Sequence, residues 1–334
     1  MSAVIDQYQR TIDYLRLSVT DRCNMNCCYC RPEGECFRGQ EGSRLLSLEE
    51  LYQLCEIFSE LGITKIKVTG GEPFLRPGIL SLLRRLKKLP GLSSVTLTTN
   101  GRMLWDTAEE LAKMGIDGIN VSLDSFQPDV FSSITGITNG KAVLDGILRG
   151  MDRALELGLP LKVNTVLMRG KNDGEIASFV QLARERPVSV RFIEMMPIGE
   201  GKRFETISGE EILMRLHAME GGLRPCEKPL GNGPAVYYDA EGWKGQIGLI
   251  RAVTAPFCSS CNRIRVTADG KLRLCLAYED GVDLAVMLRE KWSREAMKQA
   301  ICQAVFAKPA AHPLDGWKKE MSRQDGKDMW QIGG

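Results

Sequence analysis

The chain has 334 residues, of which 43% are hydrophobic and 26% are charged, as in globular proteins with one large core or two unequal ones. Its 44 lysines and arginines exceed its 42 aspartates and glutamates by two, so its net charge gives no general attraction to nucleic acid or a membrane surface. It contains no apolar run long enough for a membrane span or a secretory signal, which predicts a cytoplasmic protein. Its cysteine count of 11 is odd, so structural disulfides are not expected.

Short β-prone runs alternate with helical patterns from residue 13 to about residue 193. Strands are predicted at 13–19, 65–70, 93–99, 118–124, 161–167 and 188–194. A capping box at Ser47 and Glu50 opens the first helical pattern. The later helical patterns cover about 78–88, 105–114, 141–157 and 174–184. This alternation predicts an α/β fold with parallel strands and outer helices.

Six such units are fewer than the eight of a closed α/β barrel, so an open barrel and a doubly wound sheet both remain compatible with the pattern. In either fold, the chemistry is expected beyond the carboxyl ends of the strands. Past residue 200 the pattern changes to loop-like segments at 199–203 and 221–234, and then to short strands and an amphipathic stretch near 283–307. We therefore predict one domain over 1–220 and a smaller one over 221–334.

Four cysteines lie in the segment DRCNMNCCYC, directly after the first predicted strand. Cys23, Cys27 and Cys30, called the first trio below, have C-x3-C-x2-C spacing, and Cys28 is left over. Three thiolates on a four-iron cube leave one iron free to bind a small molecule, and thiolates are suitable ligands for such clusters. The alternatives are a zinc site that recruits Cys28 or Cys36 as a fourth ligand, and buried thiols that hold nothing.

The first trio, with the aromatic Tyr29 before its last cysteine, resembles the motif of radical S-adenosylmethionine (SAM) enzymes. The resemblance implies a [4Fe–4S] cluster that chelates the methionine moiety of SAM and splits SAM into a 5′-deoxyadenosyl radical. The segment Thr69-Gly70-Gly71-Glu72-Pro73 looks like the GGEP segment of these enzymes. It implies that Gly71 and Glu72 contact SAM, with Glu72 accepting a hydrogen bond from the ammonium group.

Two further residues resemble SAM contacts of these enzymes. Ser122, which shares the strand-end rim with Asp124, resembles a ribose or carboxylate contact, and a turn cap is the alternative. Met196 resembles a contact to the adenine edge, and a core methionine is the alternative. Tyr29, Gly71, Glu72, Ser122 and Met196 are thus the expected SAM-binding residues.

The second group of cysteines consists of Cys258, Cys261 and Cys275, called the second trio below. A hairpin is predicted between its last two members, with a three-residue loop that ends on a left-handed Gly270. This register puts Arg265 opposite Arg273 and Arg263 opposite Cys275, so a cysteine and three arginines share one surface. A two-residue turn would rotate Cys275 to the other face, because a slip of one residue inverts every side chain.

Arginines gathered beside a cluster repel one another unless an anion neutralises them, and their planar fork suits phosphate oxygens. A solvated basic hairpin is the structural alternative, and a zinc site that recruits Cys226 or Cys302 is the alternative for the second trio. Nucleic acid is disfavoured, because no extended basic stripe with interleaved aromatic residues accompanies the arginines.

Two cysteine trios, one near each end, resemble the GTP 3′,8-cyclase family from Arg16 to the terminal glycines. The resemblance implies an incomplete six-unit α/β barrel of radical SAM type, with a C-terminal domain that closes its lateral opening. It implies two [4Fe–4S] clusters, the second of which binds the guanine of GTP through its open iron. The implied contacts to GTP are Arg16, Lys67, Thr98, Lys162, Arg191, Arg263, Ile264 and Arg265. Cys28 is expected not to be a ligand.

The resemblance also implies the reaction. The 5′-deoxyadenosyl radical removes hydrogen from ribose C3′, and C3′ attacks guanine C8, which gives 3′,8-cyclo-7,8-dihydro-GTP for molybdenum cofactor biosynthesis. Arg265 is expected to help reduce or protonate the cyclised purine, and Gly333 and Gly334 are expected to extend into the active site.

The expected partners are an electron donor such as a flavodoxin or ferredoxin, and a downstream cyclic pyranopterin monophosphate synthase. The chain is expected to be a monomer or homodimer that binds neither nucleic acid nor membrane. The alternative functions are a peptide-modifying radical SAM enzyme with an auxiliary cluster, and a binding module with two zinc ions.

Overall fold

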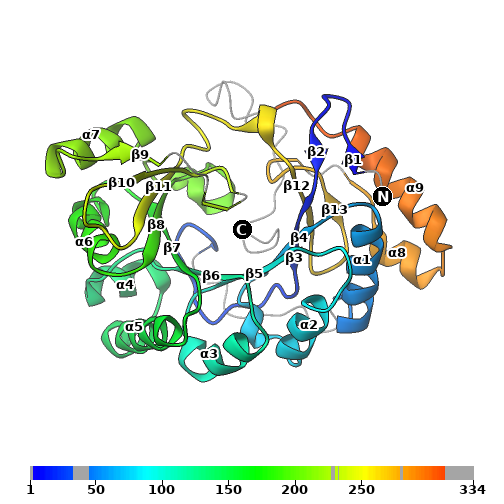
Figure 1. Ribbon diagram of the computed structural model, residues 1–334, viewed down its shortest axis with the longest axis horizontal. Helices are drawn as coiled ribbons and strands as arrows, with labels where there is room; N and C mark the ends of the chain where they lie inside the picture. Colours follow the sequence, from blue (N-terminus) through cyan, green and yellow to red (C-terminus); the bar gives the residue numbers. More distant parts are fainter. Residues whose placement is uncertain (1–2, 33–44, 227–229, 232, 279–280, 313–334) are drawn as a thin grey trace.

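The computed structural model describes residues 3–32, 45–226, 230–231, 233–278 and 281–312. Its main feature is a curved sheet that surrounds a central space, with most of the helices on the outside (Figure 1). Six strands come from the alternating part of the chain: β3 (Tyr14–Ser18), β4 (Lys65–Thr69), β5 (Ser94–Thr99), β6 (Gly118–Ser122), β7 (Leu161–Leu167) and β8 (Val188–Glu194). Each of the six predicted strands is therefore present.

The order of these strands decides between the two folds that the sequence left open. From β3 to β8 each strand pairs with the next one along the chain, and every one of these pairings is parallel. A doubly wound sheet would reverse its order at a switch point. The uninterrupted order is that of an incomplete α/β barrel.

The helices that follow the strands cover the outer face of the barrel (Figure 1). They are α1 (Leu48–Glu60), α2 (Ile79–Leu86), α3 (Leu104–Lys113), α5 (Gly140–Glu156) and α6 (Ile176–Glu185). The capping box of α1 is confirmed: the Ser47 hydroxyl accepts from the backbone N–H of Glu50, and the Glu50 carboxylate accepts from the backbone N–H of Ser47. Two helices were not predicted, α4 (Pro128–Thr135) and α7 (Gly209–Met219). Short 3-10 turns lie at η1 (Pro73–Leu75), η2 (Asp173–Glu175) and η3 (Gly199–Arg203).

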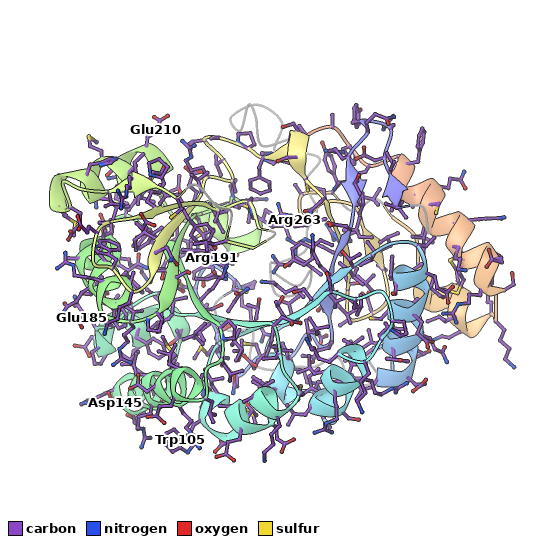
Figure 2. The ribbon with its side chains drawn as sticks, in the orientation of Figure 1. Trp105, Asp145, Glu185, Arg191, Glu210 and Arg263 are labelled. Carbon is purple, nitrogen blue, oxygen red and sulfur yellow. The ribbon has the colours of Figure 1, made fainter. Side chains whose placement is uncertain are left out.

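Side chains alternate between the two faces of the curved sheet, because successive residues of a strand point in opposite directions. In β7, Leu161, Val163 and Leu167 are buried in the apolar core, whereas Lys162 and Asn164 face the central space. The polar residues of the strands therefore line the inside of the barrel. Figure 2 shows Arg191 and Arg263 directed to this inside, whereas Trp105, Asp145 and Glu185 lie on the outer rim.

The C-terminal part of the chain extends both edges of the same sheet. Strand β11 (Gln246–Ile250) pairs in parallel with β8, and β12 (Arg263–Val266) pairs in parallel with β3. Antiparallel strands follow on each side, β10 (Val236–Asp239) and β9 (Arg224–Pro225) beyond β11, and β13 (Leu272–Arg273) beyond β12. In the described part of the chain β11 and β12 do not pair with each other, so the ring stays open. The division into 1–220 and 221–334 remains a prediction.

The amphipathic stretch predicted near 283–307 forms two helices, α8 (Leu284–Arg289) and α9 (Arg294–Phe306). Helix α9 packs beside α1 and against a small hairpin of β1 (Val4–Ile5) and β2 (Thr11–Ile12). None of the described helices has the length and apolar character of a membrane span.

Candidate active site

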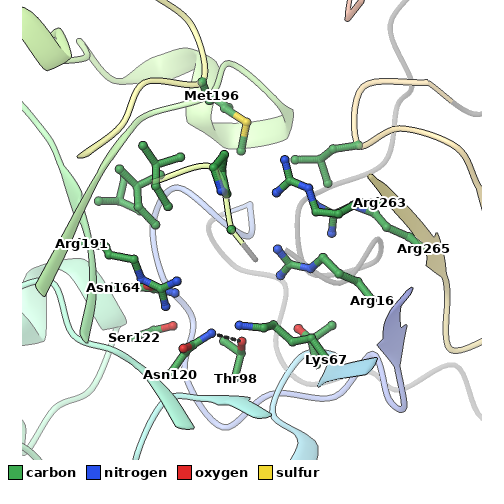
Figure 3. A pocket seen from close by; sticks show the side chains of 18 of the residues that line it. Arg16, Lys67, Thr98, Asn120, Ser122, Asn164, Arg191, Met196, Arg263 and Arg265 are labelled. Carbon is green, nitrogen blue, oxygen red and sulfur yellow. Dashed lines mark hydrogen bonds between the residues drawn. The ribbon is translucent and has the colours of Figure 1, made fainter. Parts of the chain in front are cut away.

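A cavity of about 480 Å³ lies inside the barrel, and both cysteine trios line it. Figure 3 shows Arg16, Lys67, Arg263 and Arg265 on one side of this cavity and Ser122, Asn164 and Arg191 on the other. These residues come from several strands, and the curvature of the sheet brings them together. The site lies within the barrel and at the carboxyl ends of the strands, where the alternating pattern predicts the chemistry.

The first trio lies in the loop that follows β3. None of its three cysteines is in a disulfide; all three are partly buried and line the cavity. Burial raises the pKa of Cys27 well above its ordinary value, and the neighbouring Cys30 raises it further. Cys28 is not part of the cavity lining, because it packs against a small apolar cluster and accepts a hydrogen bond from Lys171 Nζ at 3.7 Å.

The GGEP segment at the end of β4 holds the beginning of this loop. The backbone N–H of Gly71 donates to Thr20 O at 2.7 Å, and that of Glu72 donates to Arg22 O at 2.7 Å. A Cβ atom added to Gly71 would lie 2.2 Å from Arg22 O. Gly71 is therefore required by its close approach to the loop of the first trio, and it also lines the cavity.

The second trio flanks the predicted hairpin, and its loop has the predicted geometry. Arg265 pairs with Arg273, and the loop spans residues 268–270 with Gly270 at φ +90°. Cys275 faces the cavity together with Arg263, as this register requires. Burial raises the pKa of Cys261, but Lys308 and Arg263 outweigh it, so the pKa is lowered overall.

Three cations lie side by side in one row across the sheet. The parallel register places Arg265 beside Arg16, and Arg16 beside Lys67. Like charges directly opposite each other destabilise a sheet. Burial and then the neighbouring cations lower the pKa of Lys67 and of Arg265 well below their ordinary values, and that of Arg16 to about 10. The row is thus built at a cost in stability that a bound polyanion would offset.

The opposite wall adds two further cations. Lys162 Nζ donates to Leu230 O at 2.6 Å and to the Tyr237 hydroxyl at 3.2 Å, and burial followed by Arg191 lowers its pKa to about 8. Arg191 is 7% exposed, and its Nε and Nη2 atoms are buried without a hydrogen-bond partner among the described residues. Thr98 lies between the two walls, where it accepts from Asn120 Nδ2 at 3.4 Å (Figure 3).

Comparison with known protein families gives two adjacent matches along the chain. A model of the Radical SAM superfamily matches residues 17–183, and a model described as Molybdenum Cofactor Synthesis C matches residues 188–314. The GTP 3′,8-cyclase of Desulforamulus reducens is 43% identical over 336 residues, which cover 99% of this chain and 100% of that protein. The GTP 3′,8-cyclase of Syntrophomonas wolfei is 42% identical over 336 residues, with the same coverage.

The chain belongs to the GTP 3′,8-cyclase family. The family prediction from the two trios is thereby confirmed. The GTP 3′,8-cyclase of Clostridium perfringens strain 13 is also similar, with 38% identity over 98% of this chain and 99% of that protein. Among solved structures, Streptococcus suis SuiB bound to S-adenosylmethionine matches with a TM-score of 0.60 at 13% identity, over 89% of this chain and 68% of that one. This likeness concerns the fold alone.

The radical SAM part of the GTP 3′,8-cyclase family implies a [4Fe–4S] cluster and SAM, and the residues of the first trio fit them. The trio supplies three cysteines outside any disulfide to the cavity lining, and Gly71 belongs to the same lining. Among the described side chains, no group of three His, Cys, Asp or Glu residues converges on a point suited to a single metal ion. That finding concerns one ion and does not bear on a larger cluster.

Glu72 is not among the residues that line the cavity, and its contact with SAM remains a prediction. It is 1% exposed and accepts from Asn100 N at 2.7 Å, from Thr99 Oγ1 at 2.9 Å and from Phe74 N at 3.1 Å. Burial raises the pKa of Glu72 to about 7 against the effect of these donors. The Asn100 side chain in turn donates to Asn24 Oδ1 at 2.8 Å. Glu72 therefore positions the loop of the first trio.

We expect Glu72→Ala to lower the free energy of unfolding of the cluster-free chain by about 2 kcal/mol, because buried donors at Asn100 and Phe74 lose their acceptor. Denaturant unfolding monitored by circular dichroism measures this effect. Glu49→Ala removes an exposed carboxylate paired with Arg85 and is the control, with an expected change below about 1 kcal/mol. Equal losses in the two variants would contradict the role given to Glu72.

The other expected SAM-binding residues lie at the cavity. Ser122 and Met196 line it, and Tyr29 lines it while its hydroxyl donates to Asp124 Oδ2 at 2.7 Å. Asp124 also accepts from Val166 N at 2.8 Å, and burial raises its pKa to about 6. Their contacts with SAM remain predictions.

Two further expected positions lie outside the cavity lining, and two others lie outside the described residues. The side chain of Ile264 is 1% exposed in the apolar core and outside the cavity lining, because it alternates with Arg263 and Arg265. Arg273 is 2% exposed and also outside the lining, so two arginines of the hairpin rather than three face the cavity. Gly333 and Gly334 lie outside the described residues.

Sequence analysis missed four basic residues that line the cavity: Arg31, Lys65, Lys308 and His312. Lys308, 2% exposed, donates from Nζ to Leu274 O, and the His312 ring lies 2.9 Å from Ala252 O through Nε2. A lysine just after a helix commonly complements the helix dipole. No pattern in the sequence therefore distinguished Lys308 from an ordinary surface lysine.

Proposed function

We propose that the protein converts GTP to (8S)-3′,8-cyclo-7,8-dihydroguanosine 5′-triphosphate, the first step of molybdenum cofactor biosynthesis. The relatives named above carry this activity in their names. The observation that supports it best is the row of Arg265, Arg16 and Lys67 on a cavity wall shared with both trios. A buried row of cations suits a triphosphate, and thiolates beside it suit iron–sulfur clusters.

In this proposal the first trio holds the cluster that binds SAM, and the second trio holds another [4Fe–4S] cluster next to the guanine. When bound, the first cluster and SAM supply the radical that removes the C3′ hydrogen and so allows C3′ to bond to C8. The protein's own residues bind and orient GTP so that these two carbons lie close together.

The basic side chains would divide the substrate between the two walls. Arg16, Lys67 and Arg265 lie in register to receive the triphosphate, and Lys162 and Arg191 approach it from the opposite wall. Thr98 contributes a hydroxyl between the walls, and Arg263, whose guanidinium lies 4.5 Å from the Phe257 ring centre, lies beside the second trio. Arg265 is also the candidate to hold a proton near the cyclised purine. The terminal glycines are proposed to reach this site.

The proposal extends to partners and location. An electron donor such as a flavodoxin or ferredoxin would reduce the first cluster, and a cyclic pyranopterin monophosphate synthase would take the product. We propose a cytoplasmic monomer or homodimer. Addition of a candidate flavodoxin or ferredoxin in place of a chemical reductant tests the donor.

The proposal predicts a pH dependence of GTP binding that comes from Lys162. Because its pKa in the free protein is lowered to about 8, the amine carries its charge below that pH and loses it above. The affinity for GTP should therefore fall as the pH rises through about 8. In Lys162→Met this fall in affinity should be absent. Anaerobic calorimetry from pH 7 to about 9.5 measures it. If the affinity of Lys162→Met for GTP falls over the same pH range, Lys162 is not the cause of the pH dependence.

Anaerobically reconstituted protein with a reductant, SAM and GTP tests the function. The expected products are 5′-deoxyadenosine and a cyclised nucleotide, identified by mass spectrometry, with both depending on GTP. Protein that contains both clusters and forms no GTP-dependent product would reject the proposal. Formation of 5′-deoxyadenosine that responds to peptides and not to GTP would instead favour a peptide-modifying enzyme. Zinc without iron or sulfide would favour a binding module.

A further inference from the structure

The turn between β1 and β2 is organised by a buried carboxylate. Asp6 is 1% exposed, and its Oδ1 accepts from the backbone N–H groups of Tyr8 at 2.9 Å and Arg10 at 3.0 Å. Its Oδ2 accepts from Arg10 Nε at 2.5 Å. The carboxylate thus fixes both the turn and the direction of the Arg10 side chain, which is 7% exposed as a residue. We call Asp6 and Arg10 together the Asp6–Arg10 clamp.

The guanidinium of Arg10 joins two segments that are far away in the sequence. Nη1 donates to Cys258 O at 2.7 Å and to Ala310 O at 2.9 Å. Nη2 donates to Pro309 O at 2.6 Å and approaches Lys308 O at 3.5 Å. A planar fork with several fixed donors can hold diverging carbonyl groups in this way, whereas a lysine ammonium presents a point charge.

Both segments lead directly to the second trio. The carbonyl oxygen of Cys258 also accepts from Cys261 N at 3.2 Å, which closes the short turn η4 (Cys258–Ser260). Lys308 donates from Nζ to Leu274 O, the residue before Cys275. The clamp therefore contacts Cys258 directly, Cys261 through the Cys258 carbonyl, and Cys275 through Lys308 and Leu274. Neither Asp6 nor Arg10 lines the cavity, so the clamp is not a substrate contact.

We propose that the Asp6–Arg10 clamp is the positioning unit of the second trio and holds its three thiols at the spacing that a [4Fe–4S] cluster requires. This inference rests on the proposed function, in which the second trio carries such a cluster. Partners outside the ligand set commonly change metal affinity by about 10- to 100-fold, because they fix the orientation of the ligands. The clamp is specific to one trio, because the first trio lies in the loop held by Gly71 and Glu72.

Arg10→Met tests the proposal, with Arg10→Lys as the variant that keeps the charge and loses the fork. After anaerobic reconstitution we expect the iron and sulfide content of Arg10→Met to fall about twofold relative to wild type, to that of one cluster. Electron paramagnetic resonance should show that the first cluster and its shift on SAM addition are retained. Arg10→Lys should lose part of the second cluster. Arg215→Met, which removes an arginine held by Asp173 and Glu211, is the control and should keep both clusters.

Limited proteolysis of the cluster-free chain provides a readout that does not depend on the second cluster. Without the clamp, the carbonyl oxygens of Pro309 and Ala310 lose their hydrogen-bond donor. Cleavage around this segment should then be at least about tenfold faster than in wild type and Arg215→Met. Iron for only one cluster in the wild-type protein would reject the second cluster. If cleavage is nevertheless faster in Arg10→Met, the clamp links the two chain segments but positions no cluster.

Two results would overturn the proposal while leaving the proposed function intact. One is wild-type cluster content in Arg10→Met with circular dichroism unchanged. The other is equal loss of both clusters in a folded variant. Should Arg10→Met fail to fold, Arg10→Lys decides. Selective loss of the second cluster in Arg10→Lys supports the proposal. Retention of both clusters rejects it, as does loss of both.

Discussion

Gly71→Ala is expected to lower the free energy of unfolding of the cluster-free chain by about 3 kcal/mol and to reduce the SAM cleavage rate by about 100-fold. The added Cβ atom would lie 2.2 Å from Arg22 O and 2.5 Å from Arg22 C. Both are backbone atoms, so no side-chain rotation relieves the overlap. The loop must move, and the first trio begins at the next residue, Cys23.

Denaturant unfolding and the rate of 5′-deoxyadenosine formation measure the two effects. Gly146→Ala is the matched control, because Gly146 lies inside α5 and an added Cβ atom there meets nothing within 4 Å. That substitution should stabilise the chain by roughly 0.5–1 kcal/mol through helix propensity. A Gly71→Ala chain with wild-type stability and cleavage rate would show that the loop adapts without cost.

Much of the site could be predicted from the sequence because it is built from neighbouring strand ends. Arg16 and Lys67 occur two residues before the ends of β3 and β4, and parallel strands bring such positions into one row. The hairpin was predictable because Gly270 fixes the loop length, and the loop length fixes which side chains share a face. Local chemistry and chain order were sufficient for these residues.

The rest of the site depends on contacts that strand patterns do not contain. The carboxylate of Glu72 accepts from Asn100 N, just after β5, and from Phe74 N in η1. Lys308 reached the second trio from the end of α9, and Arg10 reached it from the N-terminal hairpin. Strands β11 and β12 extended the parallel sheet although the regular strand–helix alternation ends before them. Such long-range packing requires the three-dimensional structure.

Lys67→Met is expected to affect stability and binding in opposite directions. Lys67 is 9% exposed, lies beside Arg16, and has a pKa that burial and the neighbouring cations lower well below its ordinary value. Methionine fills a similar volume without the amine, so the cluster-free chain should gain about 1–2 kcal/mol at neutral pH. The affinity for GTP should fall by about 10- to 100-fold, because the triphosphate loses a charged donor.

The pH dependence of the stability gain identifies its cause. A lysine in the unfolded chain has a pKa of about 10.4, so its amine is protonated below that pH. In the folded chain Lys67 binds this proton only when the pH falls to its lowered pKa. Wild-type stability is therefore lost as the pH falls from about 10.4, and the advantage of Lys67→Met should be greater at pH 7 than at pH 10. Denaturant unfolding at these two pH values measures it.

Lys141→Met is the control for both measurements, because Lys141 is exposed on α5 and pairs with Asp145 at 2.9 Å. It should change the free energy of unfolding by less than about 0.5 kcal/mol and leave GTP affinity unchanged. A Lys67→Met chain that is less stable than wild type at pH 7 would show that the amine has a favourable partner in the folded protein. Unchanged affinity for GTP would show that Lys67, beside Arg16, does not bind the triphosphate. The cost in stability of burying this cation would then have no compensating role in GTP binding.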